Sequence, residues 1–310
     1  MAMEPILAAL DLAAMQRRRR FAISAVLFDY WELTKPEINF MIVITTAAGF
    51  WMGTAAALPN FPWMPFLHTL LGTAFVASGA ATLNQLIELR YDVQMRRTAR
   101  RPLASGRIAP SHALWFGVLL SVLGAVYLAL ATNVIASLLA ALTLLGYLFL
   151  YTPLKRISPL CTLVGTIPGA APPLIGWAAA RGRLDPAAWV LFAIVFLWQF
   201  PHFMSIAWMY REDYQRAGYL VLPTGESKNR FVAWQCLLPA LGLFIVSAVP
   251  ALRAQSGFAY FAGALVLGGI IFYCSASFAL QRSVARARQL LLVSIIYLPV
   301  LFALLVLDKK

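Results

Sequence analysis

Long apolar stretches follow one another along most of this chain, and they confine it to a membrane fold. A transmembrane helix needs about 20 mostly apolar residues. Nine stretches reach about this length, at 38–57, 66–89, 112–131, 134–152, 161–180, 187–209, 231–252, 257–280 and 289–307. Only 12% of the 310 residues are charged, which excludes an ordinary soluble domain. We therefore predict an all-α integral membrane protein with about nine transmembrane helices.

Basic residues are distributed unevenly between the loops that join these stretches. If the N-terminus is cytoplasmic, 20 of the 25 Lys and Arg residues fall on the inner side. Cytoplasmic loops of membrane proteins carry such an excess, so the net charge of +13 needs no nucleic acid to explain it. We expect a multi-pass protein of the inner (cytoplasmic) membrane, with its polar loops on the cytoplasmic side.

The N-terminal residues and the cysteines place further limits on the organisation. Residues 1–30 have their apolar part before their basic part, the reverse of a signal peptide, so we interpret them as a cytoplasmic leader. Residues 31–310 are predicted to form a single transmembrane domain. Cys161, Cys236 and Cys274 fall in expected spans without metal-binding spacing, so we expect neither disulfides nor a zinc site.

An acidic stripe ends the second expected span. Asn84, Glu88 and Asp92 follow one another at intervals of four, which keeps them within about 80° on one helical face. Mg²⁺ prefers one or two carboxylates together with substrate phosphate oxygens, and polar residues in a membrane segment are functional candidates. The alternative is that both acids are solvated at a helix end and paired with nearby arginines. Those arginines are Arg90, Arg96 and Arg97.

The arginines that follow the stripe favour an anion site. Arg97 and Arg101 are again four residues apart, and guanidinium groups bind phosphate oxygens in pairs. Acids suited to a divalent cation, beside bases suited to an anion, indicate a diphosphate. Arg96, Arg100 and Arg107 are explained more simply by the topology of the membrane.

A second polar cluster ends the sixth span, four spans later, and mirrors the first. His202, Ile206, Tyr210 and Asp213 share one face if the helix continues past Pro201. His202 is either a hydrogen-bonded structural residue or a group that ligates haem iron or moves a proton. The repeated arrangement is consistent with duplication of a four-helix unit, in which a site forms between the halves.

A third polar segment lies between the fourth and fifth spans. Lys155 and Arg156 are expected beside the other two loops, where they add positive charge to an anion site. Gly165 and Gly169, followed by two prolines, make the fifth span a poor regular helix. These glycines serve either close helix packing or substrate accommodation.

Taken together, these motifs resemble the haem-farnesylating branch of the intramembrane UbiA-type prenyltransferases. The resemblance covers nearly the whole chain. It rests on LTKPEI (33–38), N-x-x-x-E-x-x-x-D-x-x-M-x-R-T-x-x-R-P-L (84–103), YT-x-x-KR (151–156), GA-x-PP-x-x-GW (169–177), WQ-x-PHF (198–203) and DY-x-x-AG-x-x-x-LP (213–223). The sequence departs from the wider family by having Gln85 and Glu88 where aspartates are usual, and from this branch by having Cys161 where Asn is expected.

The resemblance implies a helical bundle around a central cavity, with Mg²⁺ as cofactor and farnesyl diphosphate and haem B as substrates. The product would be haem O, and the implied partners are a haem A synthase or a terminal oxidase in addition to the lipid bilayer. The implied catalytic residues are Asn84, Glu88, Asp92, His202 and Tyr210. The implied substrate-binding residues are Arg97, Arg101, Lys155, Arg156 and His202, and the implied metal ligands are Glu88, Asp92 and Asp213.

Two other functions fit parts of the pattern. The same diphosphate site can serve prenylation of an aromatic quinone precursor. A small-solute transporter also has many spans, internal symmetry and polar residues in the membrane. Transporters, however, have little use for Arg97 and Arg101 beside an acidic stripe on one side of the membrane.

Overall fold

The computed structural model describes residues 24–55, 58–225 and 227–310. Most of the expected leader, residues 1–30, therefore lies outside the described residues. Its described end is helical and continues to residue 33. Within the described residues the secondary structure is helical apart from one isolated bridge between Ser256 and Lys309.

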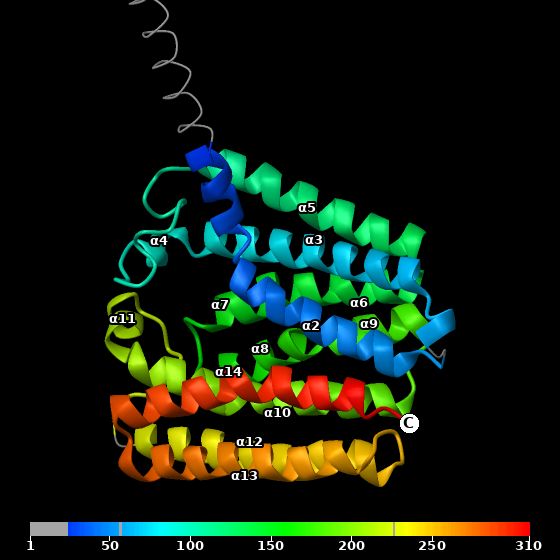
Figure 1. Ribbon diagram of the computed structural model, residues 1–310. Coiled ribbons are helices and arrows are strands. Elements are labelled where there is room, and N and C mark those ends of the chain that lie inside the picture. Colours follow the sequence, from blue (N-terminus) through cyan, green and yellow to red (C-terminus); the bar gives the residue numbers. More distant parts are fainter. Residues whose placement is uncertain (1–23, 56–57, 226) are drawn as a thin grey trace, which may run out of the picture.

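The longer helices run side by side and form one bundle (Figure 1). The helices are α2 (Pro36–Gly53), α3 (Trp63–Ile87), α4 (Leu89–Asp92), α5 (Pro110–Ala131), α6 (Val134–Leu145), α7 (Thr152–Leu154), α8 (Cys161–Ala170), α9 (Pro172–Arg181), α10 (Pro186–Met209), α11 (Arg211–Arg216), α12 (Ser227–Leu252), α13 (Phe258–Gln281) and α14 (Val284–Leu307). Two shorter segments, η1 (Leu58–Asn60) and the π-helical η2 (Gly146–Tyr151), complete the described elements.

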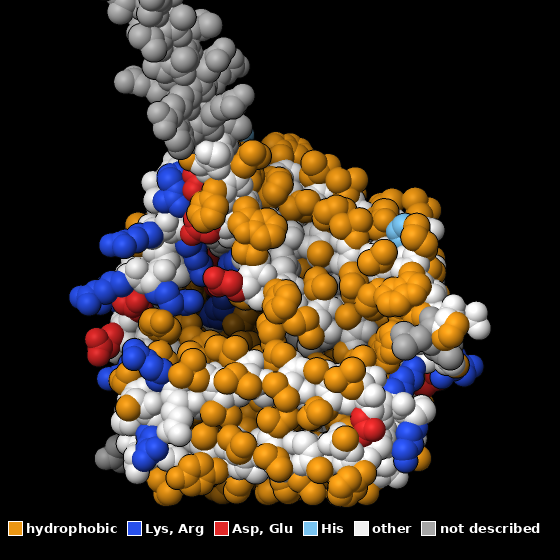
Figure 2. Space-filling model, viewed as in Figure 1, with side chains coloured by type: hydrophobic (Ala, Val, Ile, Leu, Met, Phe, Trp, Pro, Cys, Tyr) orange, Lys and Arg blue, Asp and Glu red, His pale blue; other side chains and the backbone are white. Residues whose placement is uncertain are grey.

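Among the described residues, eight helical stretches are long and apolar enough to cross a membrane, and they correspond to the eight expected spans from 66–89 onward. The first expected span, 38–57, corresponds to α2, an 18-residue helix with Glu37 in its first turn. Figure 2 shows apolar side chains over most of the visible bundle surface, as a lipid-facing surface requires. The protein is a multi-pass membrane protein, and the predicted all-helical fold is confirmed.

Two of the spans are irregular, for reasons that the sequence contains. The fifth span divides into α8 and α9 at Ala171, directly before Pro172 and Pro173. The fourth span passes through the π-helical turn of η2. By contrast, Pro201 lies inside α10 without ending it, and the helix continues to Met209.

The glycines of the fifth span allow close packing. A Cβ atom on Gly176 would lie 2.0 Å from the Thr46 carbonyl oxygen, and one on Gly49 would lie 2.1 Å from the Pro173 carbonyl oxygen. The backbones of α2 and α9 therefore touch at two points. A Cβ on Gly165 would likewise meet the ring of Tyr151 at 2.5 Å. A Cβ on Gly169 would lie 2.0 Å from Gln199 Oε1, so both glycines named in the sequence analysis lie closely packed against side chains.

We expect Gly176→Ala to destabilise the protein by about 1–3 kcal/mol, because an added methyl group must push α2 away from α9. The measurement is the midpoint of thermal unfolding in detergent. Gly269→Ala is the matched control, since a Cβ there meets nothing within 4 Å. A drop of the same size in both variants would show that the α2–α9 contact is not the cause.

Candidate active site

Three polar segments meet at one end of the bundle, where α4, α7 and α11 lie (Figure 1). The backbone N–H of Arg97 donates to Asp213 Oδ2 at 3.4 Å, and that of Leu220 donates to the Lys155 carbonyl oxygen at 2.7 Å. Figure 2 shows Lys and Arg side chains gathered at this end, around a hollow between α2 and α14. The structure thus brings together the three polar motifs that the sequence singled out.

Asn84, Glu88 and Asp92, the acidic stripe, keep a shared face although the helix is interrupted between them. α3 ends at Ile87, and Glu88 has a ψ of 1°, outside regular helix geometry. The backbone N–H of Glu88 still donates to the Asn84 carbonyl at 3.0 Å, and that of Asp92 to the Glu88 carbonyl at 2.9 Å. The three residues therefore remain stacked along one face. Glu88 is 6% and Asp92 2% exposed, which argues against the alternative of solvated residues at a helix end.

Glu88 forms a buried ion pair with the third polar segment. Lys155 Nζ lies 2.6 Å from Glu88 Oε1 and also stands over the ring of Tyr151, 4.5 Å from its centroid. Burial acts to raise the pKa of Glu88, but Lys155 outweighs burial and holds that pKa below its ordinary value. In turn, burial opposes the charge on Lys155, whereas Glu88 raises the pKa of Lys155 well above normal. Both groups are charged at neutral pH.

Asp92 has one carboxylate oxygen paired and one free. Arg101 donates to Asp92 Oδ2 at 2.7 Å. The spacing of Arg97 and Arg101 had predicted that this arginine belongs to the anion site. Asp92 Oδ1 is buried without a hydrogen-bond partner among the described residues. Burying a carboxylate oxygen without a partner is unfavourable unless another group binds it. A hard cation such as Mg²⁺ is suited to bind this oxygen.

Asn84 is held by three side chains from other segments. Its Oδ1 accepts hydrogen bonds from Lys35 Nζ and the Tyr147 hydroxyl, both at 3.3 Å, and its Nδ2 donates to Thr152 Oγ1 at 3.0 Å. Tyr147 comes from the π-helical turn of η2. The amide is therefore fixed in orientation, with its oxygen towards the basic side chain.

Sequence reasoning assigned no role to Lys35 in this site. It directly precedes α2 with a φ of 50°, a left-handed conformation that is uncommon for lysine. Burial, together with the nearby Arg101 cation, lowers the pKa of Lys35 to about 7. The sequence feature that could have predicted a role for Lys35 in the site is its position immediately before Pro36, at the inner end of an apolar span.

The second motif joins the first through its loop. α10 ends at Met209, and a turn at Tyr210 leads into α11. Asp213, 9% exposed, receives the Arg97 backbone N–H and pairs with Arg216 at 3.0 Å. The exposed Arg97 guanidinium lies 5.2 Å from the centre of the Tyr210 ring. Arg97, Tyr210 and Asp213 therefore form one corner of the site.

Arg156 is exposed at the end of the third segment. Its guanidinium donates to the hydroxyl of Tyr91 and stands over the same ring, 4.5 Å from the centroid. Arg97 and Arg156 thus differ from Lys35 and Lys155, which are partly buried and bonded to Asn84 and Glu88. Two basic side chains are available to a ligand at the surface, and two are fixed below it.

His202 lies apart from these contacts. Its Nδ1 is 2.8 Å from Ser294 Oγ of α14, and its ring stacks on Trp198 with centroids 4.8 Å apart. No contact described for His202 reaches the acidic stripe. Nδ1 of His202 is therefore used in a structural hydrogen bond. Nε2 is the ring nitrogen that remains for a ligand.

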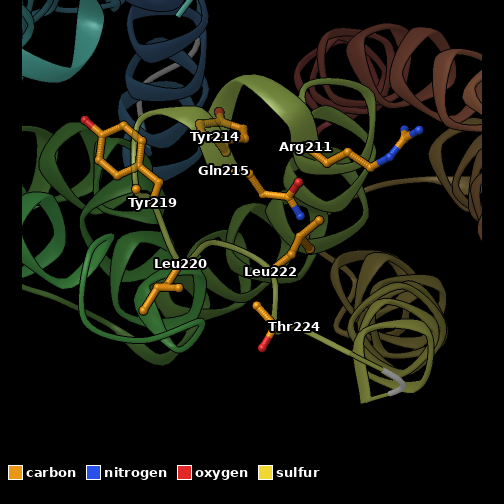
Figure 3. A pocket seen from close by; sticks show the side chains of 8 residues that line it. Arg211, Tyr214, Gln215, Tyr219, Leu220, Leu222 and Thr224 are labelled. Atoms are coloured by element: carbon orange, nitrogen blue, oxygen red, sulfur yellow. The ribbon is translucent and has the colours of Figure 1, made fainter. Parts of the chain in front are cut away.

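A small pocket of about 180 Å³ lies beside the loop that follows α11 (Figure 3). Arg211 and Tyr214 line it on α11, and Tyr219 and Leu220 line it on the loop. The Tyr219 hydroxyl is buried without a hydrogen-bond partner among the described residues. Burial, followed by the charge of Glu88, raises the pKa of Tyr219. Tyr219 therefore lies between this pocket and the acidic stripe.

In the described part of the chain, no group of three or more His, Cys, Asp and Glu side chains is close enough to hold a metal. The predicted ligands Glu88, Asp92 and Asp213 are instead each paired with a cation. This fits a Mg²⁺ ion held by few carboxylates and by the phosphates of a substrate. Cys161, Cys236 and Cys274 are free and buried.

A helical membrane bundle with paired acids and bases gathered at one end is the arrangement of an intramembrane prenyltransferase. Residues 42–301 match the model of the UbiA prenyltransferase family, and the chain belongs to that family. The family resemblance and the enzyme class expected from the sequence are confirmed. The transporter alternative is not supported.

Relatives and solved structures agree on this family. The chain is 49% identical to "Protoheme IX farnesyltransferase" of Solibacter usitatus over 91% of its own length and 98% of that protein's, and 43% identical to the protein of that name from Koribacter versatilis over 94% and 96%. A UbiA homolog from Archaeoglobus fulgidus bound to GPP and Mg²⁺ has the same fold, with a TM-score of 0.63 at 18% identity over 89% of this chain and 99% of that one.

We expect the thermal stability to rise between about pH 7 and about pH 9, and Lys35→Met to reduce this rise. The pKa of Lys35 is about 7 when folded, against an ordinary value of 10.5. The unfolded chain therefore binds more protons over this interval, and stability rises with pH wherever that holds. Glu88 and Lys155 titrate outside the interval, because their pKa values are lowered and raised respectively.

Thermal unfolding midpoints across the pH range measure this effect. Lys310→Met, at the other end of the bundle, is the matched control and should retain the wild-type slope. An equal rise with pH in the wild type and in Lys35→Met would contradict the assignment.

Proposed function

We propose that the protein transfers the farnesyl group of farnesyl diphosphate to a vinyl group of haem B, with addition of water, giving haem O and diphosphate. The carrying observation is the high identity, over almost the whole length, to proteins named protoheme IX farnesyltransferase. The buried acidic stripe with its surrounding cations supports the same chemistry. The two relatives named above carry no name that points to prenylation of a quinone precursor, the other enzyme alternative.

The diphosphate binds between the stripe and the basic residues in this proposal. Asp92, through its unpaired Oδ1, is the first candidate to hold Mg²⁺, with Glu88 and Asp213 as the other candidate ligands. When bound, Mg²⁺ supplies positive charge that stabilises the leaving diphosphate. Arg97 and Arg156 at the rim, together with Arg101 and Lys155 below, bind its remaining oxygens.

The reaction begins with cleavage of the bond between farnesyl C1 and the diphosphate oxygen, which leaves with the electron pair. The basic residues stabilise the negative charge that develops on that oxygen. The vinyl group of haem attacks the allylic cation and forms a carbon–carbon bond. Water then adds to the cation beside the porphyrin ring and loses a proton, which gives a hydroxyethylfarnesyl group. The apolar bundle keeps water from the first cation.

The residues for haem are His202 and Tyr210. His202 Nε2 is the nitrogen left for iron or for a proton, because Nδ1 bonds to Ser294. Tyr210 lies beneath Arg97, at the junction of the two motifs. Both remain candidates for positioning the water. Arg97, Arg101, Lys155 and Arg156 are also the candidates to bind the haem propionates.

The proposal includes a location and partners. Residues 31–310 act as one domain in the inner membrane, with the site on the cytoplasmic side, as the distribution of basic residues supports. The product passes to a haem A synthase or a terminal oxidase. Farnesyl diphosphate reaches the site from the bilayer, which holds its apolar tail.

Purified protein in detergent, given haem B, farnesyl diphosphate and Mg²⁺, should produce a porphyrin heavier by one farnesyl group and one water, detected by mass spectrometry. Omission of Mg²⁺ should prevent the reaction. Absence of this product, together with prenylation of a phenolic quinone precursor, would overturn the proposal.

In the same assay we expect Asp92→Asn to abolish turnover while the folded protein remains at wild-type yield, because the amide removes the charge that Mg²⁺ requires. Asp29→Asn is the matched control, since within the described residues Asp29 is paired with Arg107, outside the stripe. It should keep near-normal turnover. Near-normal turnover in Asp92→Asn would mean that the stripe serves folding rather than chemistry.

For His202→Ala we expect weaker haem binding with diphosphate binding unchanged, because alanine, unlike imidazole, cannot ligate iron. The measurements are the absorbance spectrum of added haem B and the binding of Mg²⁺-pyrophosphate. Ser294→Ala is the control, since it removes the partner of Nδ1 and keeps the imidazole. An unchanged haem spectrum in His202→Ala would make His202 a structural residue.

A further inference from the structure

A second cavity, of about 470 Å³, lies in the surface groove formed by α8, α10 and α12, away from the acidic stripe. Neither the sequence motifs nor the proposed reaction uses it. Its lining residues are Leu163, Phe200, Arg230, Phe231, Trp234, Gln235, Leu238 and Pro239. Six of the eight are apolar, and the two polar side chains belong to α12.

The groove faces lipid and runs inward from the end of the bundle where the site loops meet. Leu163, Trp234 and Leu238 are 43%, 55% and 57% exposed. Arg230 lies in the first turns of α12, at the end where α11 lies (Figure 1). Leu238 follows eight residues later, about 12 Å deeper along the helix axis. The groove therefore offers an apolar wall several carbon atoms long below one cationic side chain.

The charge at the mouth of the groove is mainly positive. Arg230 is exposed and makes no hydrogen bond or ion pair with another described residue. Lys228 and Arg211 both stand over the Trp208 ring, 5.2 and 5.4 Å from its centroid. Glu212 pairs with Arg211 at 3.6 Å. The amino-terminal end of α12 adds its own partial positive charge.

We propose that this groove is a binding site for an anionic phospholipid of the same leaflet. One acyl chain lies along Leu163, Phe200 and Leu238, and the phosphate group contacts Arg230. Trp234 and Gln235 lie between them, at the depth of the glycerol esters, where aromatic residues favour the membrane interface. Free phosphate would gain nothing from the apolar wall, and a partner helix would have to bury the Arg230 cation.

The test is native mass spectrometry of the full-length protein titrated with phosphatidylglycerol or with phosphatidylcholine of the same acyl chains. We expect the first phosphatidylglycerol molecule to bind more tightly than phosphatidylcholine, and Arg230→Gln to reduce that preference about fivefold, the effect of one basic residue beside anionic lipid. Arg288→Gln, an exposed arginine at the same end on α14, is the matched control and should keep the preference.

A second measurement locates the acyl chain of the bound lipid. Phosphatidylglycerol with brominated acyl chains should quench the fluorescence of the wild type more than that of Trp234→Phe, with Trp189→Phe as the control. Equal preference in Arg230→Gln and wild type, or equal quenching in the wild type and Trp234→Phe, would overturn the proposal. A dimer crosslinked through the groove would overturn it in favour of a protein partner. These measurements are independent of turnover, so their failure leaves the proposed reaction untouched.

Discussion

Two carboxylates buried in an apolar bundle are the constraint on which the rest of this structure depends. Glu88 and Asp92 are almost inaccessible, and each is reached by a cation, Lys155 and Arg101 respectively. Removing one partner from a buried pair typically costs about 3–5 kcal/mol. The pair between Glu88 and Lys155 therefore holds α7 against the end of α3, at the end of the bundle where α4 and α11 also lie.

The same pairs prepare the site for an ionic substrate. Without ligand the acids are balanced by the protein's own cations, so the bundle can hold them. A diphosphate with its metal brings charge of both signs, and the paired groups can then exchange partners. Asp92 Oδ1 has no hydrogen-bond partner among the described residues, so it can bind the metal without first losing a partner. The exposed Arg97 and Arg156 can move towards a ligand at little cost, whereas the partly buried Lys35 and Lys155 are held by Asn84 and Glu88.

Much of the site was predictable because helical spacing is a local property. The interval of four between Asn84, Glu88 and Asp92 predicted a shared face, and hydrogen bonds along the backbone preserve it despite the break at Glu88. The partners were not predictable in the same way. Local spacing offered Arg90, Arg96 or Arg97 to the acids, but the bundle supplied Lys155, 67 residues away from Glu88. Lys35 and Tyr147 were missed for the same reason.

The sequence by itself determined that the chain is a helical membrane protein, where its spans lie, which of its loops are basic, and which family motifs it carries. Those properties follow from composition and from periodicity along a single segment. Only the tertiary structure decided which cation meets which acid, which oxygen of Asp92 is unpaired, and which glycines bring α2 against α9. These depend on distances between segments far apart in the chain, and such distances are set by packing of the whole bundle rather than by any one stretch of residues.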